Sequence, residues 1–265
     1  MVIIHRYTET KKKLFCHTRK SNNIFGQRSS RIILKHIQHT IHKFNTIVDK
    51  NQQKHMIQIK PITTKLNALI KTHKEEKPIR PVINNVHAPP YKLAKHLNKN
   101  LNQLMSLPYT YATKNSKEVA QELSKIQIND QHKIITLDIQ DLYVNIPTQN
   151  IINITKFWLS KNINQTIVIL QTLELIKVIL IQNYFQYNDK YFKPTKVIAM
   201  GLPISSNIAE IYLQFFKELT IRHWMENGEI SYYRRHVDDI VIIFDQNKIN
   251  EELITNYMNN IHTYL

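Results

Sequence analysis

The sequence is short of glycine, cysteine and acidic residues. Only three of its 265 residues are glycine, so it has no glycine-rich loop to cradle phosphates, which excludes a Rossmann or P-loop enzyme. Its one cysteine, Cys16, excludes an internal disulfide and a cysteine-based zinc site, and it favours a reducing compartment.

Long apolar runs are also lacking. No stretch reads as a membrane-spanning helix, and the basic N-terminus lacks the apolar core of a secretory signal. We therefore expect an intracellular protein, nuclear or cytoplasmic, with no membrane segment. A chain of this length can bury a sizeable core as one large domain or two small ones.

Positive charge is abundant. The chain has 36 Lys and Arg against 20 Asp and Glu, a formal net charge of +16, which suits a polyanion such as nucleic acid and also an acidic membrane surface. Residues 1–60 are basic and polar, with a helical pattern near Ile32 to Val48. We expect a partly helical N-terminal extension there, and a loosely ordered basic tail fits the composition equally well.

Residues 61–265 form the main predicted domain, and its pattern begins with a basic hairpin. Two short strands over residues 66–83 flank a charged turn, and Pro81, which lacks an N–H, is expected at a sheet edge or strand end. Lys71, Lys74 and Arg80 crowd this hairpin. Ammonium groups and a forked guanidinium suit a phosphate grip, and a solvated basic turn explains them equally well.

Helical spacing of apolar residues predicts several helices in this domain. They cover residues 92–107, 167–181, a stretch from Ile208, and a last helix from Glu251. Ser116 is the predicted N-cap of a further short helix. The polar residues that recur every three positions between 167 and 181 predict a water-facing stripe of Gln171, Glu174 and Lys177.

Carboxylates end two of the predicted strands. Asp138 closes an apolar strand over residues 133–138, in which alternation puts Thr136 and Asp138 on one face. Asp238 and Asp239 form the tip of a hairpin over residues 232–244. Alone, such a tip is more often a surface turn. Together with Asp138 it supplies the hard oxygen ligands of a two-metal phosphoryl-transfer site, in which the cations also offset the carboxylates' mutual repulsion.

The order of these motifs resembles that of reverse transcriptases, and specifically the Penelope-like retroelement group. The resemblance covers about residues 66–260. Residues 71–74 (Lys-Thr-His-Lys) with 80–82 (Arg-Pro-Val) resemble the fingers motifs, and 137–147 (Leu-Asp-Ile-Gln-Asp-Leu-Tyr-Val-Asn-Ile-Pro) resembles motif A. Residues 199–206 (Ala-Met-Gly-Leu-Pro-Ile-Ser-Ser) resemble motif B, and 237–239 (Val-Asp-Asp) resembles motif C.

The resemblance implies an α+β right-hand polymerase with fingers and an antiparallel palm sheet, packed with helices. The sequence ends soon after motif C, so we expect a truncated domain whose thumb is missing. By the resemblance, Asp138 and Asp238 are the main ligands of two Mg²⁺ ions, or Mn²⁺ in their place, with Asp239 in support. The implied activity is RNA-templated DNA synthesis by an RNA-directed DNA polymerase, with an RNA template and a DNA primer as partners.

The resemblance also assigns the deoxynucleoside triphosphate (dNTP) contacts. Lys74 and Arg80, with Lys71, would hold the triphosphate. Tyr143 matches the aromatic position that blocks a ribose 2′-hydroxyl and so favours dNTPs. Gly201 would let the motif B backbone lie under the incoming nucleotide.

Three other classes of function remain. One is a catalytically inactive nucleic-acid-binding remnant of such an element, and His236, where the family usually has tyrosine, is a departure beside the metal site. Another is an RNA-dependent RNA polymerase, although that group usually has a carboxylate where Tyr143 stands and a glycine where Val237 stands. An RNA-binding domain of the RRM type fits least, because no RNP-like aromatic signature is visible.

Overall fold

The computed structural model describes most of the chain. The described residues are 18–20, 27–44, 46–70, 72, 79–107, 111–140, 142–182, 184–187, 190–194, 198 and 201–260. The chain divides into two compact units, in which unit 1 is Met1–Ser106 with Tyr143–Ala209 and unit 2 is Leu107–Leu142 with Glu210–Leu265. The short helix α6 (Leu142–Asn145) and the helix α9 (Ser205–Phe216) each cross a division between the units.

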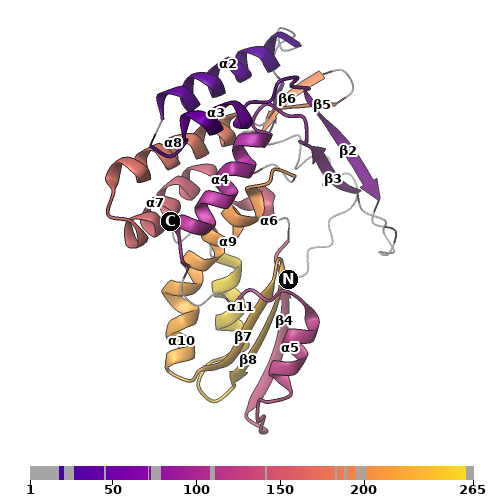
Figure 1. Cartoon of the computed structure of the whole chain (residues 1–265). Coiled ribbons are helices and arrows are strands. Elements are labelled where there is room, and N and C mark those ends of the chain that lie inside the picture. The colour runs from indigo at the N-terminus through magenta and orange to yellow at the C-terminus, as the bar shows by residue number, and fades with distance from the viewer. Residues whose placement is uncertain are drawn as a thin grey trace. The chain divides into compact units, whose positions relative to one another are not determined.

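Unit 1 contains a group of helices that pack against one another. They are α2 (Gln27–Lys43), α3 (Lys50–Met56), α4 (Tyr91–Leu104), α7 (Thr148–Asn162) and α8 (Thr166–Ile181) (Figure 1). In α4, Leu93, Leu97 and Leu101 are fully buried, as their helical spacing predicts. Complete burial of one such side chain contributes roughly 1.5–3 kcal/mol, so this stripe holds α4 in the group.

A mixed five-stranded sheet completes unit 1. Its order is β1-β6-β5-β2-β3, and its strands are β1 (Thr18–Lys20), β2 (Thr64–Ile70), β3 (Ile79–Asn84), β5 (Phe185–Tyr187) and β6 (Lys190–Pro194). The basic hairpin predicted from the sequence is confirmed, because β2 and β3 pair antiparallel. Pro81 lies in β3, at one edge of the described sheet, as expected of a residue without an N–H.

Unit 2 contains a three-stranded antiparallel sheet of order β4-β8-β7 (Figure 1). Its strands are β4 (His132–Asp138), β7 (Ile230–His236) and β8 (Asp239–Asp245). The predicted alternation of β4 is confirmed, because Thr136 and Asp138 are exposed whereas Ile135 and Leu137 pack on the core. The hairpin predicted around the paired aspartates is β7–β8.

Helices cover the core face of this sheet. They are α10 (Arg222–Glu226) and α11 (Glu251–Asn260), and a π-helical turn, Lys217–Ile221, precedes α10. The buried cluster includes Tyr233, Ile242 and Phe244 from the strands with Tyr257 from α11. A separate short helix, α5 (Ser116–Leu123), has no buried residue.

Two local predictions from the sequence are wrong. The N-cap of α5 is Asn115 rather than Ser116, because the Asn115 side chain accepts a hydrogen bond of 3.0 Å from the Glu118 N–H. Gln171 is buried and donates to Thr46 Oγ1 at 3.3 Å, whereas Glu174 and Lys177 form an ion pair on the outside of α8. This bond satisfies Nε2 of the buried amide, whereas its Oε1 has no hydrogen-bond partner among the described residues. None of the described helices has the length and apolar character needed to cross a membrane.

Candidate functional site

The acidic end of the unit 2 sheet brings two carboxylates face to face. Asp138 of β4 is the register partner of Asp239 of β8, and the Ile139 N–H donates to the Asp238 carbonyl at 2.9 Å. This pattern makes 138 and 239 a non-hydrogen-bonded pair, the kind whose side chains come closest, with Cβ atoms about 4.5–5.5 Å apart. Like charges directly opposite each other destabilise a sheet, so the pair suits a bound cation.

A third polar side chain continues this row. His236 of β7 is the register partner of Asp239, so Asp138, Asp239 and His236 share one face across the three strands. All three are exposed, and His236 Nδ1 lies 3.1 Å from the Thr113 carbonyl oxygen. His236, where reverse transcriptases of the group that the sequence resembles usually have tyrosine, therefore places an imidazole beside the two carboxylates.

The turn between β7 and β8 carries backbone strain. Val237 has a φ of +55° and is the only described non-glycine residue with a positive φ. A β-branched side chain in the left-handed region costs on the order of 1–2 kcal/mol and needs support from its surroundings. Asp238 follows directly in this turn and is half-buried.

Arg235 stabilises the strained turn from the core face of the sheet. Its side chain is 8% exposed, donates to the Val237 carbonyl oxygen at 2.7 Å and pairs with Glu210. Its backbone pairs with the extended segment 111–113, through Arg235 N–H to the Tyr111 carbonyl at 2.9 Å and Thr113 N–H to the Arg235 carbonyl at 2.8 Å. The guanidinium therefore ties the strained turn to the core of unit 2.

A buried lysine lies within reach of this ion pair. Lys217, at the start of the π-helical turn, donates to Gln214 Oε1 at 2.9 Å, and its ammonium lies 4.1 Å from the centre of the Tyr111 ring. Burial lowers the pKa of Lys217 to about 8, although Glu218 and Glu210 oppose this shift. The buried interior next to the acidic turn therefore contains two basic side chains, Lys217 and Arg235.

Lys217 predicts a pH-dependent stability. Its folded pKa of about 8 is below the usual 10.5, so between these values the unfolded chain binds a proton that the folded chain does not. The free energy of unfolding should therefore rise with pH in this window, by about 3 kcal/mol, with the full penalty present below pH 8. Urea unfolding of wild type and Lys217→Met from about pH 7.5 to 10 measures it, because the variant should lack this rise. Parallel pH profiles of the two proteins would contradict the prediction.

The three aspartates fit a magnesium site in donor type and in backbone position. Their oxygens are hard ligands, and the register gathers them at one end of one sheet. Among the described residues, however, no group of three or more His, Cys, Asp or Glu side chains converges as a metal cage. Asp138 and Asp239 are exposed, so rotation of their side chains can bring the oxygens together without moving the backbone.

The other predicted site residues belong to unit 1. Tyr143 is half-buried in α6, and its hydroxyl lies 3.4 Å from Ser206 Oγ of α9. Gly201 has a φ of +104°, and a Cβ there would overlap the Ile83 carbonyl oxygen of β3, so close packing requires glycine. The backbone of Arg80 lies in β3, whereas Lys71 and Lys74 lie outside the described residues.

Arg235 is the residue that the sequence reasoning missed. A signal was available, because alternation along β7 puts Tyr233 and Arg235 on the core face, opposite Tyr232, Arg234 and His236. An arginine on a core face must have a carboxylate or carbonyl partner. The distant Glu210 could not be identified from that pattern.

The sequence comparisons find no relative, since no family model matches the chain and no curated protein matches it. Solved structures do match. Telomerase from Candida albicans in complex with a TWJ fragment of telomeric RNA matches at 12% identity and a TM-score of 0.56, over 91% of this chain and 47% of that chain.

Two structures from Candida tropicalis give the same result. Its apo telomerase matches at 11% identity and a TM-score of 0.55, over 92% of this chain and 49% of the other. Its telomerase in complex with a TWJ fragment of telomeric RNA matches at 11% identity and 0.52, over 83% and 41%. This chain thus spans less than half the length of these three proteins and shares their fold.

Proposed function

We propose that this chain is the fingers and palm of a reverse transcriptase that synthesises DNA on an RNA template. The observation that carries the proposal is Asp138 opposite Asp239 at the end of an antiparallel sheet, next to the strained turn of Asp238. The reverse-transcriptase-like fold of the telomerase neighbours supports it. Membership of the Penelope-like group rests on the order of the sequence motifs.

The aspartates have the central role in this mechanism. Asp138, Asp238 and Asp239 would hold two Mg²⁺ ions, which when bound would activate the primer 3′-hydroxyl and stabilise the leaving pyrophosphate. The 3′-oxygen would lose its proton to solvent and form a bond to the α-phosphorus, while the bond from the α-phosphorus to the oxygen that bridges to the β-phosphate would break and pyrophosphate would leave. Asp138 and Asp239 are exposed at the end of the sheet, so both carboxylates are accessible.

Selection of the sugar is proposed for Tyr143. The hydrogen-bond distance between Tyr143 and Ser206 connects the motif A and motif B segments within unit 1. This contact would help to orient the ring, as exclusion of a 2′-hydroxyl requires. Arg80, with Lys71 and Lys74, is proposed to hold the triphosphate, because forked and point cations suit phosphate oxygens.

Removal of the Tyr143 ring should relax the choice of sugar. In Tyr143→Ala, the efficiency of ribonucleotide relative to deoxynucleotide incorporation should rise on the order of tenfold or more, because the ring no longer fills the space beside C2′. Tyr143→Phe is the matched control, since it keeps the ring and loses only the hydroxyl facing Ser206. Single-nucleotide incorporation kinetics measure the ratio. An unchanged ratio in Tyr143→Ala would remove Tyr143 from this role.

Primer extension separates the active enzyme from the inactive remnant. Purified protein, a DNA primer annealed to RNA, dNTPs and Mg²⁺ should give template-dependent extension. A protein that binds the primer–template tightly but extends nothing would fit the remnant. Extension with ribonucleotides in preference to dNTPs would favour the RNA polymerase instead.

A further inference from the structure

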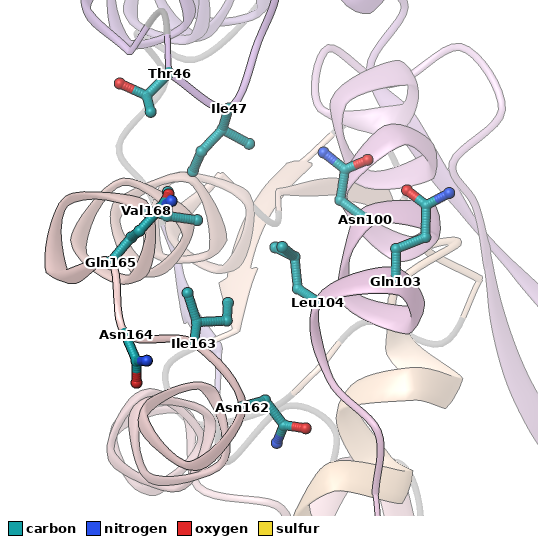
Figure 2. Close-up of a pocket in the computed structure, with 10 residues that line it drawn as sticks. All are labelled: Thr46, Ile47, Asn100, Gln103, Leu104, Asn162, Ile163, Asn164, Gln165 and Val168. Carbon is teal, nitrogen blue, oxygen red and sulfur yellow. The ribbon is translucent and has the colours of Figure 1, made fainter.

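Unit 1 contains a cavity of about 540 Å³, away from the motifs that the proposed function uses. Its volume lies within the roughly 300–1,000 Å³ of small-ligand sites. Three segments build it: the loop between α2 and α3, the end of α4, and the α7–α8 loop with the first turn of α8 (Figure 2). Its lining residues are Thr46, Ile47, Asn100, Gln103, Leu104, Asn162, Ile163, Asn164, Gln165 and Val168.

The lining is polar but carries no charge. Five of the ten residues are carboxamides, and none is acidic or basic. Next to Asn100, burial and the neighbouring Lys99 lower the pKa of His96, which favours its neutral imidazole. In a chain of net charge +16, a neutral cavity is suited to an uncharged group rather than to a phosphate.

Several of these amides are available to a ligand. Asn162 is occupied, since it accepts from the Ser106 N–H at 3.1 Å and donates to the Trp158 carbonyl at 2.9 Å. Within the described part of the chain, the side chains of Gln103, Asn164 and Gln165 make no hydrogen bond, and all three are exposed. Each offers a donor and an acceptor side by side, the pattern that pairs with the edge of a base.

Apolar walls complement these amides. Ile47, Leu104, Ile163 and Val168 are all half-buried, so each keeps apolar surface free for a ligand. Figure 2 shows Leu104 and Ile163 extending into the space between the surrounding segments. A flat, uncharged ring with polar edges fits such a lining, because its faces contact aliphatic groups and its edge pairs with amides.

Exposed cations lie next to the lining residues in the chain. Lys99 precedes Asn100, and Lys161 precedes Asn162. The ammonium of Lys161 lies 4.4 Å from the centre of the Phe157 ring. These charges suit the phosphates on either side of a base that enters the cavity.

We propose that this cavity binds an unpaired nucleobase of single-stranded nucleic acid, with Gln103 and Gln165 among the lining amides available to its edge. The proposal rests on the nucleic-acid binding of the proposed function and adds a second site outside the polymerase motifs. Bases held there would contribute affinity without taking part in chemistry.

The test compares a base-bearing and an abasic oligonucleotide in binding. Fluorescence anisotropy with a labelled oligoadenylate decamer and an abasic decamer, at about 0.1 M salt, should show tighter binding of the base-bearing strand to wild type. In Gln103→Ala/Gln165→Ala, the ratio of the two affinities should fall at least about threefold, since each base contact contributes on the order of 1–3 kcal/mol. Affinity for the abasic strand and its salt dependence should not change, because the phosphate contacts remain.

Controls distinguish this site from the polymerase site. Gln121→Ala/Gln127→Ala removes two exposed amides elsewhere and should leave the ratio unchanged. Asp245→Asn, at the other end of the unit 2 sheet, should leave it unchanged as well. Val168→Phe, which narrows the cavity without removing an amide, should lower the ratio as the double variant does.

The remaining outcomes each overturn the inference. An unchanged ratio in the double variant excludes the base pocket, while tight binding of both strands would still support the proposed function. If the protein binds neither strand, both the base pocket and the nucleic-acid binding of the proposed function are excluded. A neutral peptide that binds wild type but not the double variant would assign the cavity to a protein partner instead.

Discussion

Asp238→Ala should abolish primer extension, with incorporation reduced about a thousandfold or more. Loss of a metal ligand removes several kcal/mol of transition-state stabilisation, and each 1.4 kcal/mol is a factor of ten in rate. Asp138→Asn should have a comparable effect, because that residue closes β4 directly opposite the β7–β8 hairpin. Steady-state single-nucleotide incorporation with Mg²⁺ measures both variants, with primer–template affinity measured in parallel.

Asp245→Asn is the matched control for these variants. Asp245 ends β8 at the other end of the sheet, opposite His132, and its side chain accepts from the Asn247 N–H at 2.9 Å. Asp245→Asn should leave incorporation within about twofold of wild type, because asparagine keeps the oxygen that accepts from Asn247 and lies at the end of β8 away from the aspartate pair. If Asp238→Ala extends primers as well as Asp245→Asn does, this chain's acidic turn is not a catalytic metal site.

Asp239→Asn tests a point on which sequence and register differ. The sequence motif ranks Asp239 below Asp238, whereas the register places Asp239, not Asp238, opposite Asp138. If one cation is shared by β4 and β8, nucleotide incorporation should therefore fall more in Asp239→Asn than the sequence motif suggests.

Arg235→Leu should destabilise the protein by about 3–5 kcal/mol. The substitution removes a buried guanidinium and leaves Glu210, one of whose oxygens already has no hydrogen-bond partner, without its cation. It also removes the donor to the Val237 carbonyl, so the strained turn loses its support. Urea unfolding at neutral pH measures the difference, with the slope of the transition checked for a change in the unfolded state.

The neighbouring arginine is a close control. Arg234 also makes a two-pronged ion pair, with both Glu122 oxygens at 2.7 Å, but its side chain is 26% exposed. Arg234→Leu should cost about 1 kcal/mol or less, because solvent screens the pair. Equal losses of unfolding free energy in Arg234→Leu and Arg235→Leu would show that burial does not strengthen the Arg235–Glu210 ion pair. Arg235→Lys, which keeps the charge without the fork, should fall between wild type and Arg235→Leu.

Local patterns predicted the elements that carry the aspartates. Period-two alternation identified β4 with Asp138 at its end, and aromatic and β-branched residues around Asp238 identified the β7–β8 hairpin. These signals are strong because one face of each strand packs on a core. They do not set which residue lies opposite which, and so the Asp138–Asp239 pair came from the structure.

Interactions between distant residues could not be predicted from the sequence. The buried ammonium of Lys217 lies under the Tyr111 ring, more than a hundred residues away in the chain, and no local pattern links the two. Gln171 illustrates the opposite error. Its position in the helical pattern predicted an exposed side chain, but the side chain is buried and donates to Thr46. The requirement for glycine at position 201 comes from the approach of the Ile83 carbonyl. The nucleotide contact that the family resemblance implies for Gly201 stays a prediction.

The left-handed Val237 has a consequence for attempts to make this protein more heat-resistant. Its conformation costs free energy that glycine would not, so a selection for heat resistance alone should replace it early. A glycine at position 237 would make the turn more flexible next to Asp238 and Asp239, whose positions the proposed metal site depends on. If the proposed function holds, variants chosen for survival at high temperature should lose primer extension through this one position, which makes Val237 a residue to keep fixed during engineering.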